Sequence, residues 1–274
     1  MNPRLRNLIG LSTVLTGGLV ILGVYTAASG AGLTCAGRWP FCDGYLWLFP
    51  ATWSSFVEWF HRFVAMITGF ILLGTTVFAL REGAAPRIRR SLMGATLLLP
   101  SQIILGGLTV RTYEWVILSA HFITASLIFT GITMAYIYTL PTPERATLTN
   151  LSLGTVGIAS ALLLLTPHQF VTFGPQIQSL YYAIGLCGFG LLLGISTWGE
   201  SIQTDSIISL KLISGLTAGV LLFLLVVGRQ VFDGIAQYAS ITAGVLLVGL
   251  TVTCYILLRK SAPSTSVTGR VSGD

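Results

Sequence analysis

Residues 8–28 read LIGLSTVLTGGLVILGVYTAA, an apolar stretch without a charged side chain. A helix needs about 20 such residues to cross the hydrocarbon core of a bilayer. Backbone polar groups in lipid must find partners within the segment, which favours a helix. Seven further stretches of the same character follow, so the sequence predicts an all-α integral membrane protein with eight transmembrane helices. The predicted spans are Leu8–Ala28, Phe56–Leu80, Ser91–Val110, Trp115–Leu140, Asn150–Thr166, Gln176–Trp198, Ile207–Val227 and Ala236–Leu258.

The composition supports this class. Hydrophobic residues make up 53% of the 274 residues and charged residues only 9%, with a mean hydropathy of +0.82. Soluble domains carry roughly 25% charged residues. The net charge of +6 does not indicate nucleic-acid binding, because the basic residues sit in short loops rather than along one stripe. The first span lacks a small-residue cleavage site, which favours a retained helix in a prokaryotic plasma membrane.

The distribution of Lys and Arg predicts the orientation. With both termini in the cytoplasm, 11 basic residues lie inside and 4 outside, as the positive-inside rule expects. The inner set is Arg4, Arg6, Arg81, Arg87, Arg89, Arg90, Arg145, Lys211, Arg259, Lys260 and Arg270, and the outer set is Arg38, Arg62, Arg111 and Arg229.

The spans divide into two tandem halves. Val57-Glu58-Trp59-Phe60-His61-Arg62 aligns with Ile177-Gln178-Ser179-Leu180-Tyr181-Tyr182, and Leu105-Gly106 aligns with Val227-Gly228. Internal repeats are common in membrane folds. We therefore predict a first four-helix bundle at residues 1–143, a degenerate second bundle at 144–260 and a disordered cytoplasmic tail at 261–274.

Two of the three histidines lie inside predicted spans. His61 and His121 are each a few residues past the outer start of their helix, which places them at similar depth. Haem iron accepts two axial imidazoles on opposite faces of the ring. The pair therefore suggests a haem site toward the outer face, although each histidine could instead form hydrogen bonds within a helix interface. His168 is expected in an outer loop, as an exposed interfacial residue.

Charged residues accompany His61. Glu58, His61 and Arg62 share one helix face, so Glu58 could orient a ligand or act as a base. The alternative is an ion pair between Glu58 and Arg62 at the membrane interface. Arg62, Arg111 and Arg38 could bind haem propionates, or snorkel toward water. Cys35 and Cys42 share a long outer loop, where an oxidising compartment favours a disulfide.

The third span contains a proline and a glycine pair. We expect Pro100 to kink this helix, and Gly106-Gly107 to allow close approach of a neighbouring helix or of a macrocycle.

The first half resembles the haem A synthase family. The resemblance rests on the loop from Gly30 to Gly44, on Glu58-x-x-His61-Arg62, on Leu105-Gly106-Gly107-Leu108-Thr109-Val110 and on His121. It implies that His61 and His121 are axial ligands of a substrate-side haem, that Glu58 is needed for oxidation of a porphyrin methyl, and that Cys35 and Cys42 pair. Haem O would be oxidised to haem A for cytochrome oxidase assembly, with a haem O synthase (a farnesyltransferase) as partner and an unidentified electron acceptor.

The second half departs from the family pattern. Family members carry a second histidine pair there, around a haem b. Tyr181 occupies the position that aligns with His61, and Tyr182 occupies the position that aligns with Arg62. The last predicted span has no histidine. We therefore expect one haem site and judge a second haem b unlikely. The alternative function is a non-enzymatic haem-binding membrane protein, either an electron carrier or a haem chaperone. A transporter is disfavoured, since its usual midplane charges are missing.

Overall fold

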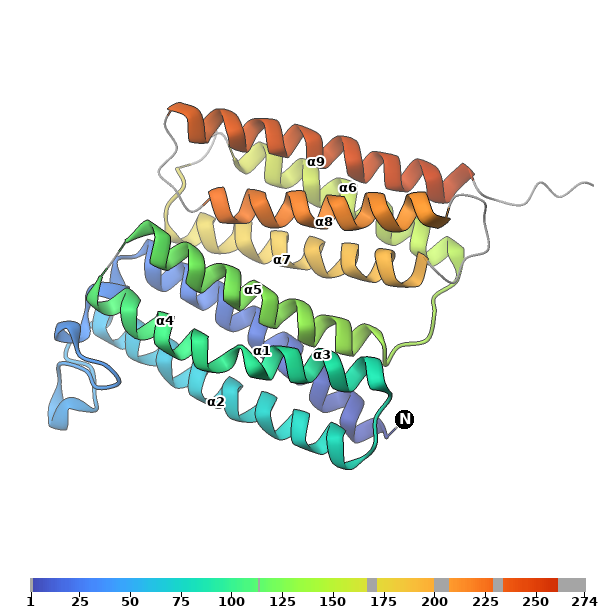
Figure 1. The fold of residues 1–274 in the computed structure, drawn as a ribbon. Helices are drawn as coiled ribbons and strands as arrows, with labels where there is room; N and C mark the ends of the chain where they lie inside the picture. The colour runs from blue at the N-terminus through green and yellow to red at the C-terminus, as the bar shows by residue number, and fades with distance from the viewer. Residues whose placement is uncertain (1, 113, 167–171, 200–206, 229–233, 261–274) are drawn as a thin grey trace, which may run out of the picture.

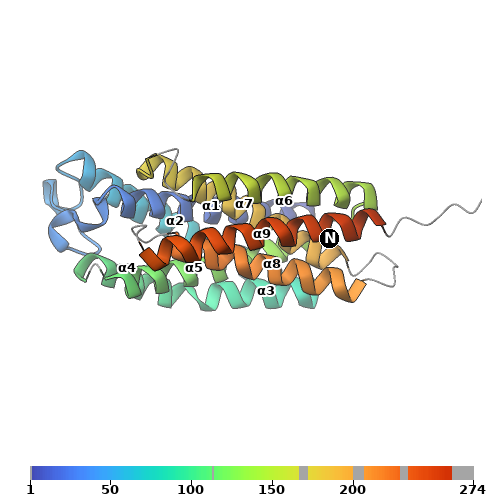
Figure 2. The ribbon, with the colours of Figure 1, turned by 90° about the horizontal axis from the view of Figure 1, so that it is seen from above.

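The computed structural model describes residues 2–112, 114–166, 172–199, 207–228 and 234–260. The described chain folds into α-helices and short 3₁₀ turns (Figure 1). Eight of its helical segments are long and apolar enough to cross a membrane, which confirms the predicted fold class. The helices run side by side along one axis, and the loop between the first two projects at one end (Figure 2). We call this the disulfide end and the opposite end, where the chain begins, the terminal end.

The helices of the first half are α1 (Pro3–Ala28), α2 (Trp53–Arg81), α3 (Pro86–Leu97), α4 (Leu99–Arg111) and α5 (Trp115–Ile137). Those of the second half are α6 (Arg145–Leu165), α7 (Pro175–Trp198), α8 (Ile207–Val227) and α9 (Gly234–Lys260). The 3₁₀ turns η1 (Ala31–Leu33), η2 (Cys35–Gly37) and η3 (Tyr45–Trp47) form the projecting loop.

One predicted span is two helices. α3 and α4 together form the third crossing and are separated at Leu98, just before Pro100. Proline has no amide hydrogen and its ring clashes with the preceding turn of a continuous helix. The predicted kink at Pro100 is therefore observed as a break, and it lets α4 take a direction of its own.

Side-chain caps fix the helix starts. Asn2 Oδ1 accepts from the Arg4 amide at the start of α1, and Asn2 Nδ2 donates to Glu82 at the end of α2. Thr52 Oγ1 accepts from the Ser55 amide at the start of α2. These bonds satisfy amides that a helix leaves unpaired in its first turn.

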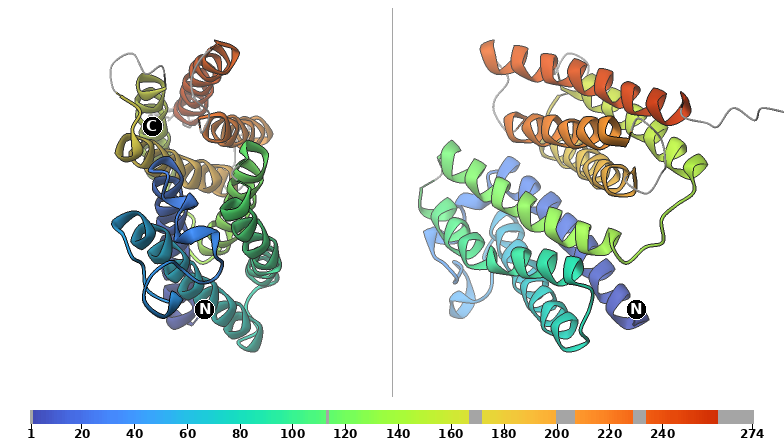
Figure 3. Two further views of the ribbon diagram at one scale, coloured as in Figure 1. Left: turned by 90° about the vertical axis from the view of Figure 1, so that its left-hand side faces the viewer. Right: turned by 45° about the vertical axis from the view of Figure 1, so that its right-hand side comes forward.

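The two halves meet through four helices. α7 packs against α1 and α5, and α8 also touches α5. The interface includes Val20, Phe122, Phe129, Tyr182 and Phe189, all of which are buried. Viewed from the disulfide end, the two groups of helices lie one above the other (Figure 3).

Candidate functional site

His61 and His121 lie on helices that do not pack against each other. α2 and α5 each pack against α1 and against the α3–α4 crossing, while the Cα atoms of α2 and α5 stay more than 8 Å apart at nearly every position. The two helices are therefore diagonal in the first bundle. Two axial ligands on opposite faces of one haem would have to come from helices that are not direct neighbours, as these are.

Each imidazole ring packs against a glycine, on α1 for His61 and on α4 for His121. A Cβ added to Gly23 of α1 would lie 3.0 Å from Cε1 of His61, and one added to Gly106 of α4 would lie 3.4 Å from Cε1 of His121. The absence of a side chain at these positions lets each imidazole rest against a neighbouring backbone. The structure thus places both predicted ligands in the interior of one bundle, on opposite sides of its axis.

The donor atoms fit an axial haem ligand. Nδ1 of His61 is buried and forms no hydrogen bond with any described residue. Leaving a buried polar atom unpaired costs free energy, so such an atom usually has a ligand or a water molecule as partner. His61 and His121 could hold the iron of a haem, with their glycine contacts orienting the rings.

Glu58 and Arg62 form an ion pair beside His61. Arg62 Nε donates to Glu58 Oε1 at 2.7 Å, one helical turn apart, and Glu58 is only 5% exposed. The sequence left open whether Glu58 and Arg62 form an ion pair, and the structure shows that they do. Burial makes it stronger than an exposed pair, because water screens it less.

Arg62 also binds the outer loop. Its Nη1 donates to the carbonyl oxygens of Arg38 at 2.9 Å and Phe41 at 2.8 Å, with that of Pro40 at 3.5 Å. Its Nη2 is buried and bonds to no described residue. One donor of the guanidinium therefore remains for an anionic group such as a propionate. Arg111 lies at the end of α4, exposed at the disulfide end.

The loop is held to the start of α2. The structure pairs Cys35 with Cys42, and both sulfur atoms lie within 4 Å of the Ser55 carbonyl oxygen. Asp43 Oδ2 accepts from Ser55 Oγ at 2.6 Å, and its Oδ1 accepts from the Ala51 amide at 3.1 Å. The Ser55 hydrogen bond is the main cause that lowers the pKa of Asp43. Because the cysteines are joined, this cluster offers no thiolates to a metal.

The aligned position of the second half is filled by aromatic side chains. Tyr181 and Tyr182 of α7 are fully buried, and the Tyr182 hydroxyl donates to the Leu225 carbonyl oxygen of α8. Phe173 packs edge-on against Tyr181 with ring centroids 5.5 Å apart, and Phe122 packs against Tyr182 at 5.3 Å. These residues form part of the packed core between the halves.

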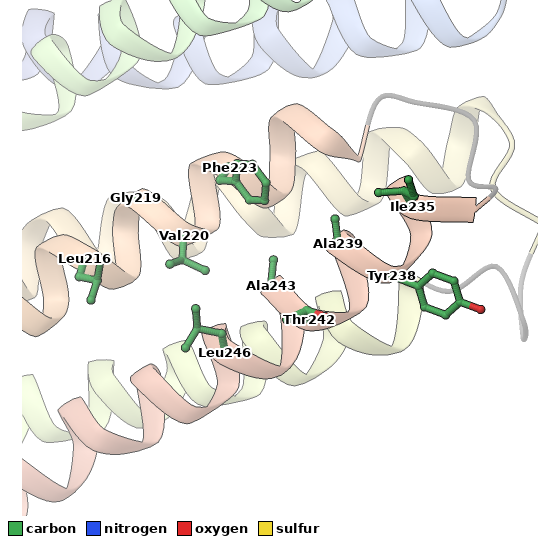
Figure 4. Close-up of a pocket in the computed structure, with 10 residues that line it drawn as sticks. All are labelled: Leu216, Gly219, Val220, Phe223, Ile235, Tyr238, Ala239, Thr242, Ala243 and Leu246. Atoms are coloured by element: carbon green, nitrogen blue, oxygen red, sulfur yellow. The ribbon is translucent and has the colours of Figure 1, made fainter.

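An apolar pocket of about 580 Å³ lies between α8 and α9 (Figure 4). Its walls include Phe223, Tyr238 and Leu246, and each of these side chains is at least half exposed. The lining has no histidine, cysteine or carboxylate. The pocket therefore offers no ligand set of the kind found in the first bundle, and we treat it as surface that faces lipid.

Comparisons with known proteins point in one direction. No family model matches the chain. The Heme A synthase of Bacillus licheniformis is 32% identical over 83 residues, which is 30% of this chain and 27% of the relative. The Heme A synthase of Rhodospirillum centenum is 26% identical over 152 residues, 52% of this chain and 40% of the relative. The chain is related to the haem A synthases.

A second group of relatives shares part of the chain. The Protoheme IX farnesyltransferase of Halobacterium salinarum (strain NRC-1) is 36% identical over 91 residues, which is 33% of this chain and 20% of the relative. The farnesyltransferase of Haloarcula marismortui is 30% identical over 117 residues, 43% of this chain and 25% of the relative. The chain thus spans between a fifth and two fifths of the length of these proteins. Both groups carry the names of proteins that act on haem.

The roles of three residues emerge only from the structure. Gly23 contacts His61, Trp39 lies against Gly107, and Asp43 anchors the loop. Gly23 lies one turn beyond Val20 on the buried stripe of α1, so a small residue on an apolar face was a signal for close packing. Trp39 and Asp43 carry no such periodic signal, because they lie in a loop. His168 and Arg229 fall outside the described residues.

Proposed function

We propose that this chain is a haem A synthase, which oxidises a methyl group of haem O to the formyl group of haem A. The observation that carries the proposal is the arrangement of the first bundle. Two histidines lie on diagonal helices of this bundle, and a buried carboxylate lies one turn from one of them. The relationship to Heme A synthases supports this substrate class.

His61 and His121 would hold the iron, and a haem bound there supplies the redox chemistry at its own macrocycle. The chain's residues fix the ring plane through the helix positions and the glycine contacts. Nη2 of Arg62 would bind a propionate, with Arg111 near the same end. The acidic edge of a bound haem would then lie toward the disulfide end.

Glu58 would handle the protons of the reaction. Oxidising a methyl to a formyl group with the oxygen atom supplied by water releases protons and electrons, and the electrons pass to an acceptor outside this chain. Arg62 engages Oε1 of Glu58, so Oε2 is the oxygen that accepts a proton. A positioned general base speeds such transfers about 10²–10⁴-fold. A simple electron carrier has no need of this carboxylate.

The proposed location is the plasma membrane of a prokaryote. Both termini would lie in the cytoplasm, because Lys and Arg concentrate at the terminal end. The disulfide end and the histidine pair then lie toward the outer face. A haem O synthase that makes the substrate would be a partner, since its product is lipid-soluble and must pass between two membrane enzymes.

The test is co-expression with a haem O synthase, followed by extraction and chromatography of the haems. We expect haem A with the wild-type chain. Glu58→Gln should keep its bound haem and lose the product by about 10²-fold or more. Wild-type membranes that contain haem O without haem A would contradict the proposal.

A haem carrier or chaperone is the second candidate. It is favoured by the second half, where a buried Tyr181 stands at the position that aligns with His61 and the last span has no histidine. The Glu58→Gln variant separates the two functions. A carrier keeps both haem content and electron transfer after this change, whereas the synthase keeps the haem and loses its product.

A further inference from the structure

The first bundle is not closed around its circumference. Toward the terminal end, α2 packs against α3, and Thr76 and Thr96 share a hydrogen bond of 2.7 Å. Toward the disulfide end α4 continues the crossing that α3 begins, so α4 is the helix expected to pack against α2. The Cα atoms of α2 and α4 nevertheless stay more than 8 Å apart at nearly every position.

Glycines show that side chains do not fill this gap. Gly69 of α2 and Ile103 of α4 are each seven residues from the Thr76–Thr96 pair, so they lie at one level of two antiparallel helices. A Cβ added to Gly69 would meet no atom within 4 Å. Ile103 is 55% exposed. A Cβ added to Gly106 would meet only His121, and one added to Gly107 would meet only Trp39.

The gap faces lipid and leads to the histidines. α7 and α8 cover α1 and α5, and Figure 1 draws α2 and α4 on the opposite side of the molecule. His61 and His121 are both only partly buried. The side chains along the neighbouring surface are apolar, as Met66, Phe70 and Ile104 are all more than half exposed.

The loop segment 38–41 spans the gap at its disulfide end. Arg62 of α2 holds the carbonyl groups of this segment. The Trp39 ring lies 3.7 Å from the Cβ position of Gly107 on α4. The segment therefore connects two helices that do not touch each other. Between Arg62 and Thr76 the gap extends over 14 residues of α2, about 21 Å at the rise of an α-helix.

We propose that this gap is a lateral mouth, through which a prenylated haem enters from the outer leaflet and in which its isoprenoid chain then lies. Trp39 holds the loop over the outer end of the mouth, so the porphyrin passes beneath it. An isoprenoid chain is apolar and resides in the bilayer, so a route through an apolar side opening avoids its transfer into water. The proposal rests on the proposed function, because the histidine pair must bind the ring.

The experiment places a bulky residue in the mouth. Gly69→Trp and Gly69→Leu fill it, and Gly74→Trp and Gly74→Leu are matched controls on the same helix, where an added Cβ also meets nothing within 4 Å and the position is exposed. The full chain is reconstituted in nanodiscs, and uptake of haem O or haem b from phosphatidylcholine vesicles is followed through the Soret band.

We expect Gly69→Trp to slow haem O uptake by about tenfold or more, and to weaken haem O binding relative to haem b by a similar factor. Gly74→Trp should stay within about twofold of wild type. Trp39→Ala should accelerate both uptake and release of haem O, with an unchanged bis-histidine spectrum at equilibrium.

Other outcomes overturn the proposal. Equal haem O uptake rates in Gly69→Trp and Gly74→Trp would exclude the mouth, and an equal loss of haem O and haem b affinity would exclude the isoprenoid chain from it. A dimer that Gly69→Trp dissociates would make the gap an interface between copies. The uptake assay does not depend on turnover. Wild type that takes up haem O but makes no haem A would overturn the proposed function and leave the mouth standing, whereas wild type that binds neither haem would overturn both.

Discussion

The two halves of this protein share a helix order and differ in how their interiors are used. In the second half, each of α6, α7, α8 and α9 packs against both of its neighbours around a closed ring. In the first half, the ring is open between α2 and α4. The second half carries the buried Tyr181 where the first half has the partly buried His61, and its last span has no counterpart of His121.

Glycines express the same difference. A Cβ added to Gly188 of α7 would lie 2.7 Å from Cγ2 of Ile158, and one added to Gly244 of α9 would lie 2.8 Å from Leu163. Those glycines bring second-half helices together. Gly69, Gly106 and Gly107 instead border space or receive a histidine or tryptophan ring. Under the proposed function, the first half would be the binding site and the second half the scaffold that packs against it.

The largest expected effect is the loss of an axial haem ligand, which we predict only for substitutions in the first half. His61→Ala or His121→Ala should lower haem affinity by about 10²-fold or more and abolish the bis-histidine spectrum, because one axial bond is lost. Tyr181→Phe, the matched change at the aligned position, should leave both unchanged. Haem titration monitored by absorbance provides the measurement. A spectrum that depends on Tyr181 would reverse the assignment of the two halves.

Glycine-to-alanine substitutions should change the free energy of unfolding in opposite directions in the two halves. Gly188→Ala should destabilise the protein, since overpacking costs about 1–3 kcal/mol and the Cγ2 of a β-branched residue cannot swing away. The Cβ added by Gly69→Ala would meet no atom within 4 Å. This variant should therefore raise the free energy of unfolding by up to about 1 kcal/mol, because alanine has the higher helix propensity. Thermal unfolding in detergent compares them. Equal shifts would show that both halves are packed alike.

A smaller effect concerns the buried hydroxyl of the scaffold half. Tyr182→Phe removes the hydrogen bond to the Leu225 carbonyl oxygen in the last turn of α8. Carbonyl groups of a last helical turn lack a partner within the helix. We expect a loss of about 1 kcal/mol in unfolding free energy with haem binding intact. A changed haem spectrum in this variant would link the tyrosine to the site.

The smallest effect is expected at the loop that covers the binding half. The pKa of Asp43 is lowered from its ordinary value of 3.8, chiefly by the Ser55 hydroxyl. A lowered folded-state pKa means that Asp43 stabilises the loop above about pH 4, and that this contribution is lost as the pH falls through the lowered pKa. Proteolysis of the loop should therefore rise below pH 4 in wild type. Asp43→Asn should show faster proteolysis at pH 7 and no such pH dependence; identical profiles would exclude the anchor.

Much of the fold was predictable, because long apolar stretches in lipid permit little besides helices. The break before Pro100 followed from the chemistry of proline. The first-half resemblance to haem A synthases also followed from local motifs, and the relatives bear it out.

The remaining features depend on helix directions that no local pattern encodes. The separation of α2 from α4 follows from the course of α4 after its break, and the contact of Trp39 with Gly107 follows from the path of a loop. Arg62 could be assigned to Glu58 by its spacing of four residues, but its bonds to the loop carbonyls join positions more than 20 residues apart. Such contacts emerge from tertiary packing.

The most direct test of the central claim is the haem content of the purified full-length chain, measured by pyridine haemochrome assay against protein concentration. A single site in the first bundle predicts one haem per chain with a bis-histidine spectrum, no haem in the His61→Ala/His121→Ala double variant, and an unchanged ratio in Tyr181→Phe. Two haems per chain, or haem retained by the double variant, would contradict the account.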